Sequence, residues 1–273
     1  MSRESASLWV AVVLAFGVVA GLWYYSTQLK PTTTAPTIAP VETKSSAPAD
    51  IAPEGPLYPV PEVPTTERPN LRPLPNLDDS DEFLKLELGD LFGPDLRPLL
   101  ADSRVIERIV VTIDNLPRPH VTERMRPLTA IQGPFPADES GAENEYILNP
   151  EGYRRFDSLV RLFADTDSEA MAGLYRRYYS LFQDAYDDLG YPDGYFNDRL
   201  IEVIDHLQTV PRPAEPIVLL RTHVLYQFAD PELEALSSGQ KLLLRMGPDN
   251  AQTVLAKFRE LRALIASWEQ DSG

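Results

Sequence analysis

Three carboxylates at helical spacing form the pattern best suited to chemistry. Asp198, Glu202 and Asp205 stand at positions i, i+4 and i+7, so a helix brings them within about 60° of one another. The apolar residues of this stretch fall on the opposite side and are Leu200, Ile204 and Leu207. Such a row is typical of a solvated helix face. If another element covers it, the row forms a groove for a cationic ligand, or a carboxylate pair for acid–base hydrolysis once burial raises one pKa.

The turn before this row carries candidates for binding. Tyr191 and Tyr195 flank it, and Asp193 lies between them. The two rings are expected to form an exposed aromatic surface for a peptide or a glycan. The helix that follows is expected to be capped by Asn197 or Asp198, because short polar side chains accept hydrogen bonds from the first turn.

Residue spacing predicts no metal and no cofactor. A twelve-residue calcium loop that starts at Asp187 would need oxygen ligands where Leu189 and Tyr191 stand; an irregular calcium site among these acids is the alternative. The histidines lack the spacing of a regular zinc site and are His120, His206 and His223. The sequence has no glycine-rich phosphate loop.

Composition excludes further classes of function. The chain has no cysteine, which excludes disulfides, thiolate metal sites and a Cys nucleophile. The net charge of −16 argues against nucleic acid as a partner.

Ser238 and Lys241 have the S-x-x-K spacing that activates a serine. The K-T-G motif that should accompany it is missing, and Ser238 is better explained as the start of a helix.

The elements that must position these residues are predicted to be mostly α-helical over residues 79–273, because apolar residues repeat with a period of about 3.6. Helix boundaries are expected at an N-cap Ser103, at Asn149–Pro150, at a terminating Gly190, at Asp230–Pro231 and at Gly247–Pro248. Residues 128–148 differ, since 133–136 and 146–148 are expected to pair as a small β-hairpin. The fold class is therefore mostly α, with at most that hairpin.

Residues 1–30 are predicted to be a cytoplasmic tail and a membrane anchor. Residues 8–25 contain no charge and would span about 27 Å as a helix, close to the hydrocarbon thickness of a bilayer. The alternative is a cleaved signal peptide, but no A-x-A cleavage site directly follows the apolar run. Gly17 and Gly21 form a G-x-x-x-G that allows two such helices to dimerise.

Residues 31–78 are expected to be a proline-rich, disordered linker. Residues 31–75 hold twelve of the 26 prolines, and proline removes backbone donors that a helix or a central strand needs. The stretch is interpreted as a plain tether or, alternatively, as a docking strip for a proline-reading partner. Either way, the domain is placed at a distance from the bilayer.

Three strings of the sequence carry a resemblance to a known family: DNLPRPHV at 114–121, AYDDLGYPDGYFNDRLIEVIDHL at 185–207 and LYQFADPELEALSSGQKLLLRMGPDNA at 225–251. Together they resemble a bacterial domain-of-unknown-function family (family 3014) of membrane-anchored proteins in Gram-negative bacteria. The resemblance implies a shared fold and an envelope setting. It assigns no catalytic residue to this chain.

These observations lead to two functional hypotheses. The first is a single-pass protein of the inner membrane whose domain lies in the periplasm and binds an envelope protein or the cell wall without catalysis. A short tail before a long domain favours this orientation, although the charges around residues 8–25 give almost no bias. The alternative is a cell-wall hydrolase or transferase that uses the carboxylates of the 198–205 helix.

Overall fold

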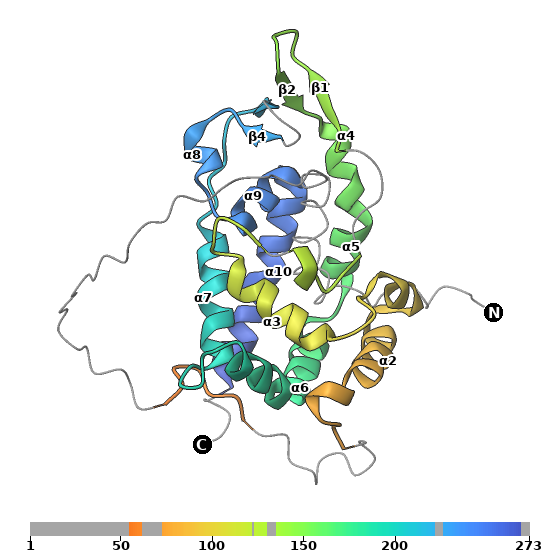
Figure 1. Cartoon of the computed structure of the whole chain (residues 1–273). Helices are drawn as coiled ribbons and strands as arrows, with labels where there is room; N and C mark the ends of the chain where they lie inside the picture. The colour runs from red at the N-terminus through yellow and green to blue at the C-terminus, as the bar shows by residue number, and fades with distance from the viewer. Residues whose placement is uncertain (1–54, 62–72, 122, 130–134, 222–225, 269–273) are drawn as a thin grey trace, which may run out of the picture.

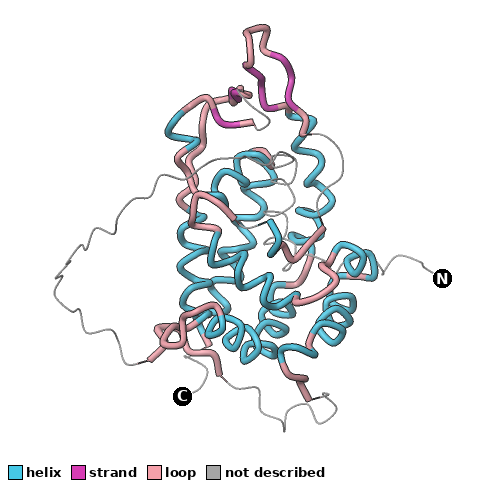
Figure 2. Tube along the Cα trace, viewed as in Figure 1, coloured by secondary structure: helices cyan, strands magenta, loops and turns pink. Residues whose placement is uncertain are grey.

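The protein forms a bundle of α-helices with a small antiparallel sheet at one end (Figures 1 and 2). The computed structural model describes residues 55–61, 73–121, 123–129, 135–221 and 226–268. The α-helices are α2 (Asp81–Phe92), α3 (Val105–Asn115), α4 (Pro150–Tyr153), α5 (Asp157–Asp165), α6 (Ser168–Asp188), α7 (Phe196–Gln208), α8 (Pro231–Glu234), α9 (Ser238–Arg245) and α10 (Pro248–Ser267). Turns of 3₁₀-helix are η2 (Leu77–Asp79), η3 (Pro94–Leu99), η4 (Glu123–Met125) and η5 (Arg154–Phe156). The prediction of a mostly α-helical domain is confirmed.

The expected membrane anchor lies outside the described residues. Residues 8–25, and with them Gly17 and Gly21, precede the first described range. Among the residues that are described, no helix combines the length and the apolar character needed to cross a bilayer.

The main core is built around α3. Both α6 and α7 pack against α3 on one side and against α10 on the other. The α3 side chains that face this core are Val105, Ile106, Ile109, Val110 and Ile113. Large aromatic residues fill the space between the other helices and include Tyr178, Phe163, Phe196 and Phe258. Burial of each such side chain contributes roughly 1.5–3 kcal/mol, so this core holds α7 firmly in place.

Local signals predict several helix boundaries correctly. Asn149 caps α4 by accepting a hydrogen bond from Glu151 N, and Pro150 is the first helical residue. α6 ends at Asp188, and Gly190 follows with φ +110°. α10 begins at Pro248 directly after Gly247.

The start of α3 differs from the prediction. Ser103 is not its cap, because Arg104 with φ 58° stands directly before the first residue, Val105. The carboxylate of Asp81, the first residue of α2, accepts hydrogen bonds from Arg104 N (2.7 Å) and Val105 N (2.8 Å). A side chain from another helix therefore satisfies the donors that a local cap would have taken.

The sheet is larger than the predicted hairpin. The strands are β1 (Ala137–Glu139), β2 (Glu145–Leu148), β3 (Val218–Leu220) and β4 (Gln227–Phe228), in the order β1-β2-β3-β4 with antiparallel pairing. The β1–β2 hairpin was expected, but its first strand follows Pro136, which has no N–H to donate. β3 and β4 were not foreseen. β3 pairs with β2 across about 70 residues of sequence, and β4 joins the sheet only through β3. A second apolar cluster supports the sheet and includes Leu148, Leu219, Phe228 and Leu233.

We predict that Gly247→Ala lowers the free energy of unfolding by more than about 2 kcal/mol, because its backbone conformation is open essentially to glycine alone. Gly247 has φ +85° and ψ 161°, and a Cβ there would lie 2.5 Å from the ring of Tyr153. The matched control is Gly173→Ala in α6, where the added Cβ meets nothing within 4 Å. Urea denaturation should show the control unchanged or up to about 1 kcal/mol more stable. Equal effects of the two variants would contradict the prediction.

Candidate functional site

Gln183 of α6 sets where α7 begins. Its Oε1 accepts a hydrogen bond from Phe196 N (2.9 Å), and its Nε2 donates to Gly194 O (2.8 Å). α7 therefore starts at Phe196 with no side-chain cap of its own. The expectation that Asn197 or Asp198 caps this helix is wrong, because Gln183 already takes a donor of the first turn. Sequence reasoning missed Gln183, since its partners lie in the next helix and the turn before it.

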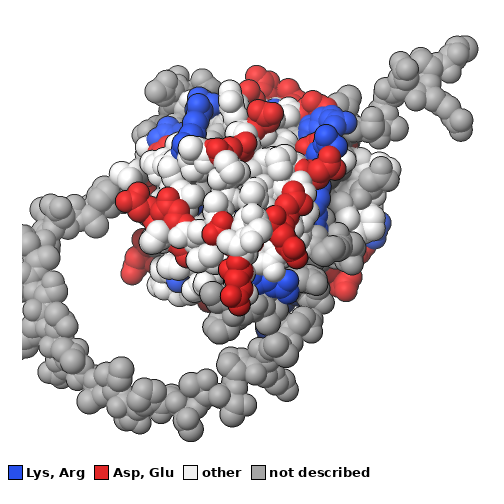
Figure 3. Space-filling model, turned by 90° about the horizontal axis from the view of Figure 1, so that it is seen from above, with Lys and Arg blue, Asp and Glu red and all other residues white. Residues whose placement is uncertain are grey.

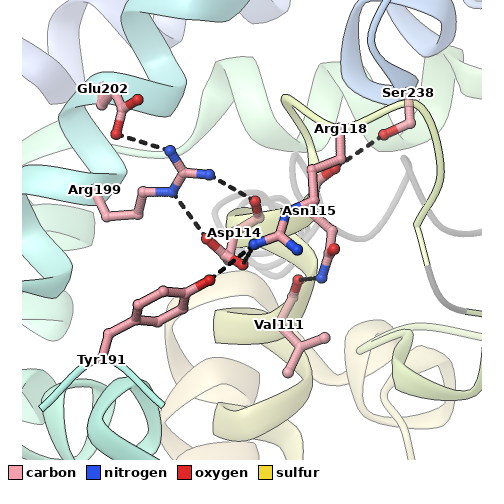
Figure 4. A network of polar contacts seen from close by, with 8 residues as sticks. All are labelled: Val111, Asp114, Asn115, Arg118, Tyr191, Arg199, Glu202 and Ser238. Atoms are coloured by element: carbon pink, nitrogen blue, oxygen red, sulfur yellow. Dashed lines mark hydrogen bonds and ion pairs between the residues drawn. The ribbon is translucent and has the colours of Figure 1, made fainter. Parts of the chain in front are cut away.

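A buried carboxylate joins α3 to α7 (Figure 4). The Asp114 side chain is 4% exposed and pairs with Arg118 (2.6 Å) and with Arg199 (3.0 Å). Arg199 also donates to the main-chain oxygen of Asp114 (2.8 Å) and to Glu202 (2.8 Å). Arg118 donates to the Tyr191 hydroxyl (2.9 Å), which ties the turn before α7 to the same cluster.

The charges of this cluster balance one another. Burial by itself would lower the pKa of Arg199, but Glu202 and Asp114 raise it overall. Burial, together with the charge of Asp114, raises the pKa of the neighbouring Tyr186. Arg199 therefore remains charged and Tyr186 remains neutral at physiological pH. We call the ion pairs among Asp114, Arg118, Arg199 and Glu202 the ion-paired joint, because they link α3 to α7.

The N-terminus of α9 closes the cluster from the other side. The Ser238 hydroxyl donates to Asn115 O and Leu116 O (3.2 Å each), as Figure 4 shows for Asn115. Ser238 is the first residue of α9, so the predicted helix start is confirmed. The Lys241 ammonium pairs instead with Glu234 (3.1 Å). The S-x-x-K residues therefore have separate structural contacts and do not form a serine–lysine pair.

The acidic row of α7 is divided among three different partners. Asp205 forms a bidentate pair with Arg262 of α10 (2.5 and 2.7 Å). Glu202 pairs with Arg199 and stays 67% exposed. Asp198 accepts hydrogen bonds from the main chain of a distant segment. The three carboxylates lie on one helix face as predicted, but their contacts do not converge on a common point.

That distant segment is residues 55–61, which we call the docked arm (Figure 1, orange, at the foot of the bundle). Asp198 accepts from Leu57 N (2.8 Å) and from Tyr58 N (2.9 Å), and Asn197 donates to Tyr58 O (2.8 Å). Arg176 donates to Pro61 O (3.0 Å). The arm lies within the stretch 31–78 expected to be a linker, and its contacts with the domain were not expected.

The remaining candidates of the turn differ in their contacts and exposure. Tyr191 stacks on Tyr186 with the ring centroids 4.8 Å apart, so its ring belongs to the cluster. Asp193 is exposed, and Tyr195 is 38% exposed. Across the described ranges, no group of three His, Asp or Glu side chains is placed to hold a metal ion.

The fold and the site define a helical domain whose central helix ends in a buried, ion-paired joint. Residues 105–262, more than half of the chain, match the family described as "Protein of unknown function (DUF3014)". The protein belongs to this family, as the resemblance predicted. No curated protein and no solved structure gives a match.

All three strings that carry the family resemblance contribute residues to this ion-paired joint and its immediate surroundings. Asp114 and Arg118 belong to the first of the three strings, Tyr191 and Arg199 to the second, and Ser238 to the third. These strings are far apart in the sequence, yet they meet at the C-terminal end of α3 (Figure 4).

We predict that Asp114→Asn lowers the free energy of unfolding by about 3 kcal/mol, because it removes the buried carboxylate of the pair that Asp114 forms with the largely buried Arg199. The control is Glu202→Gln, which removes a carboxylate that pairs with the same arginine but is 67% exposed. That change should cost less than about 1 kcal/mol. Urea denaturation at pH 7 compares them, and a larger loss in the control would contradict the assignment of Asp114 as the organising charge.

Proposed function

We propose that the protein is a single-pass protein of the inner membrane whose acidic helical domain is a non-enzymatic binding module in the periplasm. The uncharged run 8–25 supports the anchor, and the prolines of 31–75 support a spacer. A module on such a spacer meets partners away from the bilayer.

The observation that carries a binding function is the capture of a peptide main chain by Asp198 and Asn197. Paired carboxylates that catalyse hydrolysis must converge on one substrate bond. Here Asp198 holds the docked arm, while Glu202 and Asp205 are tied to two different arginines. These contacts favour binding over the hydrolase or transferase alternative.

The proposed partner is an envelope protein or the cell wall, and not nucleic acid. Figure 3 looks down on the sheet end and shows acidic side chains between and around separate groups of basic ones. Such a surface suits a neutral or basic partner better than a polyanion. Gly17 and Gly21 would additionally allow a homodimer through the anchor.

The orientation is tested by cysteine labelling, because the chain has no cysteine of its own. We predict that a membrane-impermeant maleimide labels Ser158→Cys in intact spheroplasts, since Ser158 is exposed on α5. Ser5→Cys, in the tail before the anchor, should be labelled only after lysis. The reverse pattern would contradict the periplasmic placement, and release of the protein by carbonate would contradict the anchor.

The binding role is tested by photo-crosslinking in cells. We predict that p-benzoylphenylalanine at position 195, which is 38% exposed beside α7, captures one recurrent envelope component. The same group at position 158 on α5 serves as the control for non-specific capture. Mass spectrometry identifies the product. If a folded and exported protein gives no crosslinked product from position 195, the proposal of a binding module is contradicted.

A further inference from the structure

We propose that the site occupied by the docked arm is a peptide-recognition site, whose ligand is a proline-flanked segment that bends at a central tyrosine and belongs to an envelope partner. The arm, residues 55–61, fills the site when the partner is absent. This inference rests on the proposed function and names the ligand class of the binding module.

Recognition is directed mainly at the peptide main chain. The hydrogen-bonded atoms of the arm are Leu57 N, Tyr58 N, Tyr58 O and Pro61 O. The two oxygens of Asp198 accept from consecutive N–H groups, and Asn197 donates to the carbonyl that follows them. Leu57 and Tyr58 lie in a bend, which turns both N–H groups toward the same carboxylate. Main-chain contacts of this kind supply affinity for any segment that adopts the same bend. The site therefore does not depend on the arm being part of the same chain.

The protein groups are held ready for this contact. Asn197 is fully buried, and the Tyr175 hydroxyl donates to its Oδ1 (3.2 Å), which turns Nδ2 toward the arm. Burial raises the pKa of Tyr175 well above its ordinary value, with smaller effects from Tyr179 and Asp198. The hydroxyl therefore stays a donor. Asp198 lies in the first turn of α7, where the helix dipole favours a negative charge.

One side chain of the arm supplies specificity. Leu57 is 60% exposed and contributes its main-chain N–H to Asp198. Tyr58 packs against the main core and interacts electrostatically with Arg262. The prolines around it are Pro56, Pro59 and Pro61. Because proline fixes φ in the free peptide as well, a segment of this type loses little conformational freedom on binding.

The arm competes with any partner from within the chain. A tethered ligand acts at an effective concentration in the millimolar range. Weakening the arm should therefore open the site, and the natural probe is the arm's own sequence. The test requires a fluorescein-labelled peptide of residues 54–63, EGPLYPVPEV, and the full chain in detergent micelles.

We predict that the Tyr58→Ala protein binds this peptide at least tenfold more tightly than the wild type, measured by fluorescence anisotropy, because its own arm competes less well. A peptide methylated at the tyrosine nitrogen should bind at least tenfold more weakly, since it lacks one N–H that Asp198 accepts. This second comparison leaves the protein unchanged, so it does not depend on a variant that folds.

The matched control on the protein side compares two aspartates near the start of α7. Asp198→Asn, combined with Tyr58→Ala, should reduce peptide binding at least tenfold, because an amide offers only one acceptor oxygen. Asp193→Asn removes the same charge from the exposed turn and should leave binding unchanged. Circular dichroism confirms that all variants are folded.

Three results would overturn the inference. The first is no binding of the peptide to the folded Tyr58→Ala protein, and the second is equal binding of the methylated peptide. The third is a wild-type dimer that Tyr58→Ala dissociates, since the arm would then occupy a second copy. If photo-crosslinking from position 195 persists unchanged in Asp198→Asn, the binding module stands but its partner docks elsewhere.

Discussion

The packing of the bundle depends on neutralising the buried charge of Asp114. This carboxylate is buried at the C-terminal end of α3, where the helix dipole is itself negative. An isolated charge in such a place would cost several kcal/mol. Arg199 from α7 meets both the side chain and the main-chain oxygen of Asp114, so the counter-charge also completes the helix end. α7 is thereby fixed against α3.

The same joint orders the surroundings of α7. Arg118 links Asp114 to Tyr191 in the turn before α7, and Gln183 links that turn to α6. The turn is therefore held from α3 and from α6 at once. The first residues of α7 are then presented at a defined position and angle, which a recognition site requires.

Two aspartates in this fold use their carboxylates in the same way. Asp81 at the start of α2 and Asp198 at the start of α7 each accept hydrogen bonds from two consecutive backbone N–H groups of another segment. Both lie where the helix dipole stabilises a negative charge. For Asp81 the segment is the start of α3, which is part of the core. For Asp198 it is the docked arm, which we propose a segment of a partner can replace.

The sequence by itself determined those structural features that depend on a few neighbouring residues. It predicted the mostly helical fold, the cap at Asn149 and the end of α6 at Gly190, because capping and termination depend on local geometry. It also placed the acids of α7 on one face. Only the tertiary structure decided that Asp81 takes the place of Ser103 at α3, and that Asp198 holds the arm. Those partners are separated by long stretches of chain, and their contact arises only once core packing has brought the segments together.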